Sequence, residues 1–216
     1  MKAKRLSAFT FLIVSISIVT AAAHEGHTHH SMGSAMDKNR PAPLAGESIY
    51  QLSEKWKTQA GNEVPLSSLT GKPTIIAMIY TSCPDACPMT IADLKRIEAA
   101  IPPDSRSKVN FAIFSFDTKR DTPEKLSEFA KARALDPSRW TLFYGSKMAV
   151  RKLAAVLGIQ YKEDSSGNID HSNVITVVDS SGVIRHQQTG LGKESKETVE
   201  QVMKLTSQPS PEKKTP

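Results

Sequence analysis

The sequence predicts an α/β fold in which helices cover both faces of a central mixed β-sheet. Three observations support this prediction. The run from Thr74 to Tyr80 is apolar throughout, as is typical of a strand buried on both sides. Strand-like and helix-like apolar patterns then alternate along residues 86–157. Near the C-terminus, two apolar runs flank the turn sequence Ser-Ser-Gly, which is typical of a β-hairpin.

The predicted domain begins with short strands and continues into its first long helix. Strands over 49–52 and 63–66 are expected to form an N-terminal β-hairpin around a Gly-Asn turn. The buried strand follows at 74–80. A helix is predicted over 86–100, and the two prolines that come next end it. The inner face of this helix is formed by Ile91, Leu94 and Ile97.

The next segments repeat the order strand, helix, strand, helix. The apolar run 109–116 predicts a second central strand. Thr122 is expected to cap a helix that ends at about Arg133, because a proline at the first helical position and an acidic residue follow it. A strand over 140–144 and a helix over 146–157 come next. The apolar residues of that helix are Met148, Leu153, Val156 and Leu157.

The last elements complete a known arrangement. Strands over 174–178 and 183–186 form the C-terminal hairpin, and a final helix covers about 193–205. This order of elements fits a thioredoxin-like sandwich. We expect one such domain over residues 46–206.

The two ends of the chain differ in composition from the domain. Residues 1–23 combine a basic start, an apolar stretch and three alanines, which indicates a signal peptide and export to the periplasm. An uncleaved membrane anchor is the alternative, but the apolar stretch is short for a span. Residues 24–45 form a polar, His-rich leader that we expect to be disordered, and 207–216 form a flexible tail.

The charge of the chain excludes one class of partner. The formal net charge is +6, and loss of the three basic residues of the signal would leave +3. The remaining basic residues are scattered and form no stripe with interleaved aromatic residues, so we expect no nucleic-acid binding.

We expect the protein to be a monomer.

The cysteines are the most informative residues. The chain has only two, Cys83 and Cys87, in the motif YTSCPDACP between a predicted strand and a predicted helix. A helix N-terminus favours thiolate, and residues four apart share a helix face, so both sulfurs can point at one ion. A structural disulfide is the alternative, but it would close a very short loop and stabilise little. The motif therefore favours redox or metal chemistry.

His171 adds a third candidate ligand. It stands in NIDHSNVITVVD, in a predicted loop before a strand that should lie beside the cysteine-bearing strand. Thiolates select Cu(I), and an imidazole extends the site to Cu(II) and Zn(II). A structural zinc normally has a fourth protein ligand, and no third cysteine exists to supply it. The residue types thus favour a transferable ion and leave copper and zinc open. His186 is expected to be a surface histidine.

The leader carries a candidate auxiliary metal site. Histidine clusters in disordered segments bind Cu(II) and Zn(II) loosely, although a neutral polar leader is the alternative. The candidate ligands are His24, His27, His29 and His30. Three methionines are soft enough to assist with Cu(I): Met32, Met36 and Met89.

The motifs resemble those of the Sco/SenC family of exported thioredoxin-like copper proteins. The resemblance rests on YTSCPDACPMT, SFDTKRDTPEKLSEFA and DHSNVITVVD, which occur here in the family's order, and it covers about residues 45–205. It implies that Cys83, Cys87 and His171 bind copper, as Cu(I) or Cu(II). It also implies that Asp117 lies near the site. Asp85 is a lesser candidate, as a residue that adjusts the thiol pKa or touches a partner, and a plain helix-start acid is the alternative. Two further residues are expected to hold their own loop together: Arg120 and Asp121.

The family resemblance also implies a role. Members deliver copper to the dinuclear copper centre of cytochrome c oxidase, or reduce its cysteines. We therefore expect a copper metallochaperone whose membrane-proximal partner is oxidase subunit II or another exported copper protein. The enzyme hypothesis is a thiol-disulfide reductase in which Cys83 attacks and Cys87 resolves. The sequence leaves these two open, and a copper or redox sensor is a third, less supported hypothesis.

Overall fold

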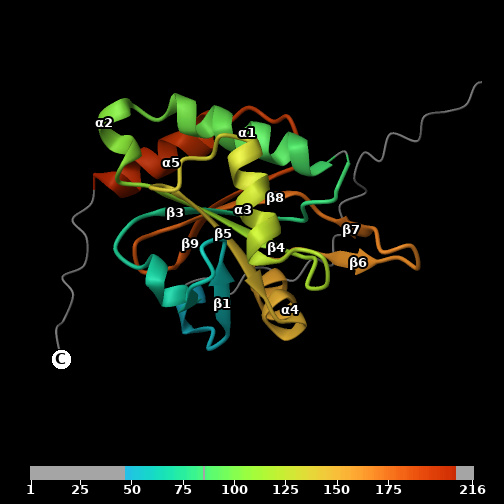
Figure 1. Ribbon diagram of the computed structural model, residues 1–216. Coiled ribbons are helices and arrows are strands. Elements are labelled where there is room, and N and C mark those ends of the chain that lie inside the picture. The colour runs from blue at the N-terminus through green and yellow to red at the C-terminus, as the bar shows by residue number, and fades with distance from the viewer. Residues whose placement is uncertain (1–46, 85, 208–216) are drawn as a thin grey trace, which may run out of the picture. The chain divides into compact units, whose positions relative to one another are not determined.

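The computed structural model describes residues 47–84 and 86–207, and these form the α/β domain shown in Figure 1. The predicted signal peptide, the His-rich leader with its four histidines, Asp85 and all but the first residue of the tail lie outside the described residues. In the part of the chain that is described, no helix has the length and apolar character needed to cross a bilayer.

A seven-stranded mixed sheet forms the centre of the domain, in the order β2-β1-β5-β4-β3-β8-β9. Its strands are β1 (Lys55–Thr58), β2 (Glu63–Pro65), β3 (Thr74–Ile79), β4 (Asn110–Ser115), β5 (Trp140–Gly145), β8 (Val174–Val178) and β9 (Ile184–Thr189). Strands β3, β4 and β5 are parallel, and β8 pairs antiparallel to β3. Because the three parallel strands run the same way, the loops that follow them leave the sheet at one edge.

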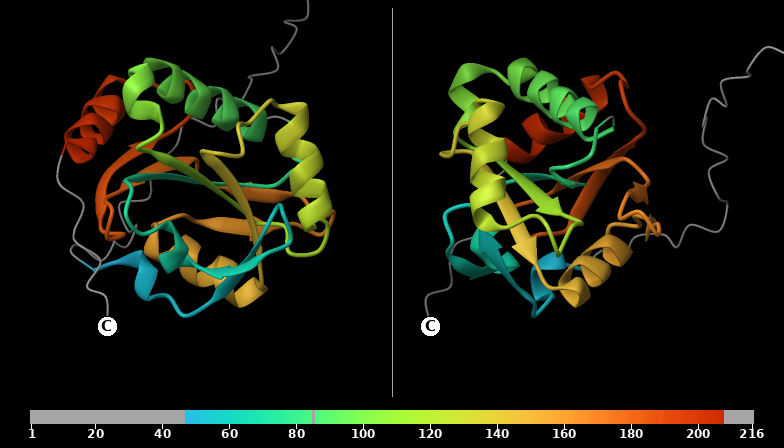
Figure 2. Two further views of the ribbon diagram at one scale, coloured as in Figure 1. Left: turned by 60° about the vertical axis from the view of Figure 1, so that its left-hand side comes forward. Right: turned by 45° about the vertical axis from the view of Figure 1, so that its right-hand side comes forward.

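Helices cover both faces of this sheet, as predicted. They are α1 (Ala86–Ala100), α2 (Pro103–Arg106), α3 (Pro123–Ala132), α4 (Lys147–Val156) and α5 (Lys196–Thr206). Helices α1 and α5 lie side by side on one face, and α4 lies on the opposite face (Figure 2). Helix α3 packs against β5. The predicted inner face of α1 is confirmed, because Ile91, Leu94 and Ile97 are all buried. The predicted cap of α3 is confirmed as well, since the Thr122 side chain accepts a hydrogen bond from Lys125 N.

The predicted N-terminal hairpin exists, but its first strand is displaced. Residues Ile49–Gln51 form a short 3-10 helix, where the sequence predicted a strand. The strand is β1, whose sequence Lys-Trp-Lys-Thr alternates between solvent and core, so that Trp56 is buried between exposed lysines. It pairs antiparallel with both β2 and β5. The Ser48 side chain caps the 3-10 turn by accepting from Tyr50 N.

The predicted apolar face of α4 is partly wrong. Met148 is 57% exposed, whereas Leu153 is fully buried. The two residues are five positions apart, and at about 100° per residue they cannot share one face of a helix. The buried residues of α4 are Ala149, Val150, Leu153 and Ala154.

The polar segment before His171 forms a hairpin that the sequence did not predict. Strands β6 (Tyr161–Glu163) and β7 (Ile169–His171) make a separate two-stranded sheet. Asp164 stabilises its turn by accepting from the backbone N–H groups of Ser166 and Asn168, at 2.8 and 2.9 Å. Gly167 has a φ of +82°, a conformation that glycine adopts readily. His171 therefore stands at the end of a strand instead of in a loop.

Candidate metal centre

The cysteine loop connects two elements of the core, β3 and α1. Only Cys87 belongs to the helix, because α1 begins at Ala86 and Cys83 precedes it. This corrects the expectation that both cysteines share one helical face. The Cys83 sulfur instead accepts a hydrogen bond from Cys87 N, with an S–N distance of 3.4 Å, at the N-terminus of the helix. Both residues are thiols, and Cys83 is half-buried whereas Cys87 is fully buried.

Burial decides the protonation of Cys87. It raises the pKa of this thiol far above its ordinary value, and the neighbouring Cys83 and the negative charge of Asp121 raise it further. The hydrogen bond from Tyr80 N, at 3.5 Å from the sulfur, acts in the opposite direction. For Cys87, desolvation thus outweighs the helix N-terminus that was expected to favour thiolate.

His171 reaches Cys87 from the β6–β7 hairpin. Its Nε2 lies 3.9 Å from the Cys87 sulfur. Nδ1 lies 3.3 Å from the Ser172 carbonyl oxygen, so a proton on Nδ1 can be donated there, which leaves the lone pair of Nε2 facing the sulfur. Burial lowers the pKa of His171, and the ring packs beside Phe116 with centroids 4.7 Å apart. The neutral imidazole is the form that binds metals.

The three predicted ligands therefore converge, but they do not form a closed metal site. Among residues 47–84 and 86–207, no three His, Cys, Asp or Glu side chains are grouped tightly enough to hold an ion as they stand. The Cys87–His171 pair fits a shared ion nonetheless. Ligands at about 2.3 Å (sulfur) and about 2.0 Å (nitrogen), the distances found for zinc, lie at most about 4.3 Å apart, and this pair is separated by 3.9 Å.

Asp121 supports the cysteine half of the site. It is fully buried and accepts hydrogen bonds from Thr81 N at 3.0 Å and from Thr81 Oγ1 at 2.5 Å. A third bond comes from Ser115 Oγ, also at 2.5 Å. Sequence reasoning expected Asp121 to hold only its own loop. The structure shows that it also holds the start of the cysteine loop, a contact between residues 40 positions apart.

Asp117 supports the loop that follows β4. It is 4% exposed and accepts from the backbone N–H groups of Lys119 and Arg120. Its carboxylate also forms an ion pair with the Arg120 guanidinium, which raises the pKa of that arginine. These contacts lie within residues 117–120. The carboxylate whose charge acts on the Cys87 thiol is that of Asp121.

Comparisons with known proteins identify the family of this chain. The SCO1/SenC family model matches residues 49–207. A relative from Stutzerimonas stutzeri is 25% identical over 57% of this chain, and the match spans 62% of that protein's length.

Two solved structures are similar in fold. The copper-bound ScoI of Bradyrhizobium japonicum is 26% identical, has a TM-score of 0.57, and is matched over 70% of this chain and 96% of that one. BsSco, in which a disulfide switch was identified, is a member of the Sco family of cytochrome c oxidase assembly proteins. It is 20% identical with a TM-score of 0.63, over 77% of this chain and 97% of that one. The protein described here belongs to the SCO1/SenC family.

Proposed function

We propose that this chain is an exported copper metallochaperone that binds copper through Cys83, Cys87 and His171 and passes it on by ligand exchange. The contact between Cys87 Sγ and His171 Nε2, 3.9 Å apart, carries this proposal. These atoms come from residues 84 positions apart, on a core helix and on a peripheral hairpin. Two thiols and one imidazole are a soft donor set that suits Cu(I) and also accepts Cu(II).

The exposure of the ligands suits a cargo ion. Three protein donors leave an open coordination position, whereas structural sites usually have four protein ligands. Cys83 is half-buried and Cys87 is fully buried. An incoming donor of an acceptor protein therefore meets copper on the side of Cys83, while Cys87 retains the ion until the exchange is complete.

The nature of two related proteins supports the choice of cargo and acceptor. The Bradyrhizobium japonicum relative holds copper, and BsSco belongs to a family of cytochrome c oxidase assembly proteins. We therefore propose the dinuclear copper centre of oxidase subunit II as the acceptor, with another exported copper protein as the alternative. The leader histidines would capture Cu(II) before it enters this site.

A thiol-disulfide reductase is the second candidate function. It is favoured by the adjacent thiols of two cysteines that differ in exposure. Cys83 would attack a partner disulfide and release one partner thiol. Cys87 would then attack Cys83, release the second partner thiol and leave a disulfide on this chain. The raised pKa of Cys87 suits the resolving position, because the resolving thiol acts only after the first attack.

Copper titration of the reduced protein separates the two functions. Under anaerobic conditions we expect one tight Cu(II) site with a sulfur-to-copper charge-transfer band and a matching electron paramagnetic resonance (EPR) spectrum. His171→Ala should weaken the binding and shift both signals. His186→Ala is the matched control, because His186 is half-buried on β9 and contacts Thr198. Absence of tight copper binding, together with a readily exchanged disulfide, would instead support the reductase.

A further inference from the structure

The loop that follows β4 contacts both halves of the proposed site. Through Asp121 it holds Thr81, at the start of the cysteine loop. Through Arg120 it holds Gly167, in the turn of the hairpin that ends at His171. Arg120 and Asp121 are adjacent in sequence. One short loop therefore connects the support of Cys87 with the support of His171.

The hairpin depends on such contacts because it has little support of its own. Strands β6 and β7 form a two-stranded sheet that is separate from the central sheet, and a hairpin of this size is marginally stable alone. At its base, Ser172 N donates to the Gln160 carbonyl at 2.9 Å. Nearby, Ile169 N donates to Tyr80 Oη at 3.4 Å.

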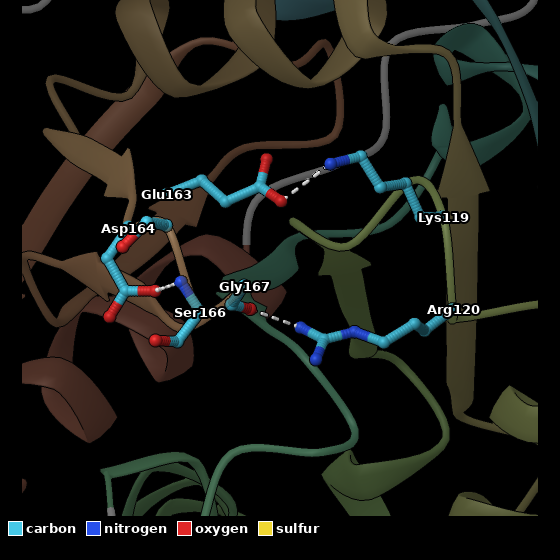
Figure 3. A pocket seen from close by; sticks show the side chains of 7 residues that line it. Lys119, Arg120, Glu163, Asp164, Ser166 and Gly167 are labelled. Atoms are coloured by element: carbon cyan, nitrogen blue, oxygen red, sulfur yellow. Dashed lines mark hydrogen bonds and ion pairs between the residues drawn. The ribbon is translucent and has the colours of Figure 1, made fainter.

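Two side chains reach the hairpin across a groove of about 520 Å³. Figure 3 shows Lys119 and Arg120 on one side of this groove, and Glu163 and Gly167 on the other. Lys119 Nζ lies 2.7 Å from Glu163 Oε1, but the lysine side chain is largely exposed and the glutamate partly so, and an ion pair screened by water contributes little.

The Arg120 contact is of a different kind. Its Nε donates to the buried carboxylate of Asp117, and its Nη2 donates to the Gly167 carbonyl at 2.5 Å. Asp117 is fixed in turn by two backbone N–H groups. The guanidinium is thus oriented on one side and binds the hairpin backbone on the other. A planar fork of donors can do both at once, whereas a lysine ammonium lacks that geometry.

We propose that Arg120 is a positioning residue for His171. By joining Asp117 to Gly167 it holds the hairpin against the loop, and so holds Nε2 of His171 in reach of Cys87. Arg120 thereby sets how tightly the site retains copper and how fast it releases it. This inference rests on the proposed function, because it assumes that His171 is a copper ligand.

Copper retention in Arg120→Gln tests the proposal. Residues that orient metal ligands typically change affinity by about 10- to 100-fold when they are replaced. We therefore expect Arg120→Gln to release copper to a chelator at least about tenfold faster, with an EPR spectrum shifted toward that of His171→Ala. Lys119→Gln is the matched control on the same groove and should behave as the wild type. Arg120→Lys keeps the charge but not the planar set of donors, and its rate of copper release should lie between those of the wild type and Arg120→Gln.

A double-mutant cycle distinguishes positioning from general loss of structure. In a His171→Ala background, Arg120→Gln should change copper release no further, because the residue it acts through is already gone. An equal loss in both backgrounds would overturn the proposal. In the metal-free protein, Arg120→Gln should speed hydrogen exchange at Ile169 N while the amides of α1 keep their protection. Unchanged exchange at Ile169 would also overturn it.

The same measurements separate this inference from the proposed function. If His171→Ala binds and releases copper like the wild type, the proposed function fails, and the inference fails with it. If His171→Ala weakens binding but Arg120→Gln releases copper at the wild-type rate, the proposed function stands and only the role of Arg120 is wrong.

Discussion

The cysteine loop and the histidine hairpin meet at one site, but their supports differ in kind. The cysteine loop joins a central strand to a core helix, and Thr81 near its start is bound by the fully buried Asp121. The hairpin is a separate small sheet whose cross-groove contacts come from the partly exposed Arg120 and Lys119. The comparison teaches that the two cysteines are held by the central fold, whereas His171 is held by packing beside Phe116 and by a few polar contacts of its hairpin. Changes in the residues that support the cysteine loop should therefore chiefly lower stability, and changes in the residues that support the hairpin should chiefly affect metal retention.

The largest expected effect is loss of the cysteines. Cys83→Ala and Cys87→Ala should each abolish tight copper binding, because the remaining thiol and imidazole make a two-donor set. Cys87→Ala should also lower the free energy of unfolding by about 1 kcal/mol, since it removes a buried side chain from the core. Equilibrium copper competition and urea denaturation measure the two effects. Tight copper binding retained in both single variants would contradict the site.

The next effect concerns Asp121. Asp121→Ala leaves Thr81 and Ser115 without their buried acceptor, and we expect the free energy of unfolding to fall by about 3 kcal/mol. Asp164→Ala, in the hairpin turn, is the comparison variant, and it should cost less than about 1 kcal/mol because Asp164 is exposed. Urea denaturation of the metal-free proteins checks both. Equal losses in the two variants would show that the two supports do not differ as described.

The smallest effect is a difference in pH dependence between the β6–β7 hairpin and the turn between β8 and β9. Burial lowers the pKa of His171 from 6.5, so its stabilising contribution is present above about pH 6.5 and is lost as the pH falls through the folded-state value. Burial of Asp179, in the turn between β8 and β9, would raise its pKa, but hydrogen bonds from Ser181, Val183 and Arg185 lower it below 3.8. Its contribution is present above about pH 3.8 and is lost only under more acidic conditions.

Hydrogen exchange between pH 7 and pH 5 tests this difference. The amides of the β6–β7 hairpin should lose protection across that range, after correction for the intrinsic pH dependence of exchange. Val183 N, which donates to Asp179, should keep its protection. His171→Gln should remove the change in the hairpin. Hairpin amides that stay protected at pH 5 in the wild type would contradict the prediction.

The sequence predicted the cysteine half of the site better than the histidine half. The apolar strand 74–80 and helix α1 have strong local patterns, so their elements and inner faces were confirmed. The predicted helix over 86–100 already placed Cys83 ahead of its first residue, so only the inference from the i, i+4 spacing, that both cysteines share one helical face, was wrong. In the structure, the Cys83 sulfur accepts a hydrogen bond from Cys87 N at the start of α1. The spacing of the two cysteines alone does not reveal this contact.

The histidine half was hidden by long-range contacts. Residues 161–171 are mostly polar and lack a strand pattern, so the sequence did not predict the hairpin. In the structure, its turn is stabilised by Asp164, and Arg120 contacts it at Gly167, 47 positions away. The contact of Asp121 with Thr81 is likewise non-local. The available signal in the sequence was that Asp121 follows a central strand, at the edge where the parallel strands end. This signal could place Asp121 near the site but could not identify Thr81 as the residue that it binds.

The burial of Cys87 has a consequence for the energetics of copper transfer. Burial raises the pKa of its thiol, which favours the neutral form, so copper that binds the sulfur must displace a proton. In the proposed function, loading would be a proton-coupled exchange, and delivery to an acceptor would return a proton to the same sulfur. Acid would therefore weaken copper binding at this sulfur, and alkaline conditions would strengthen it.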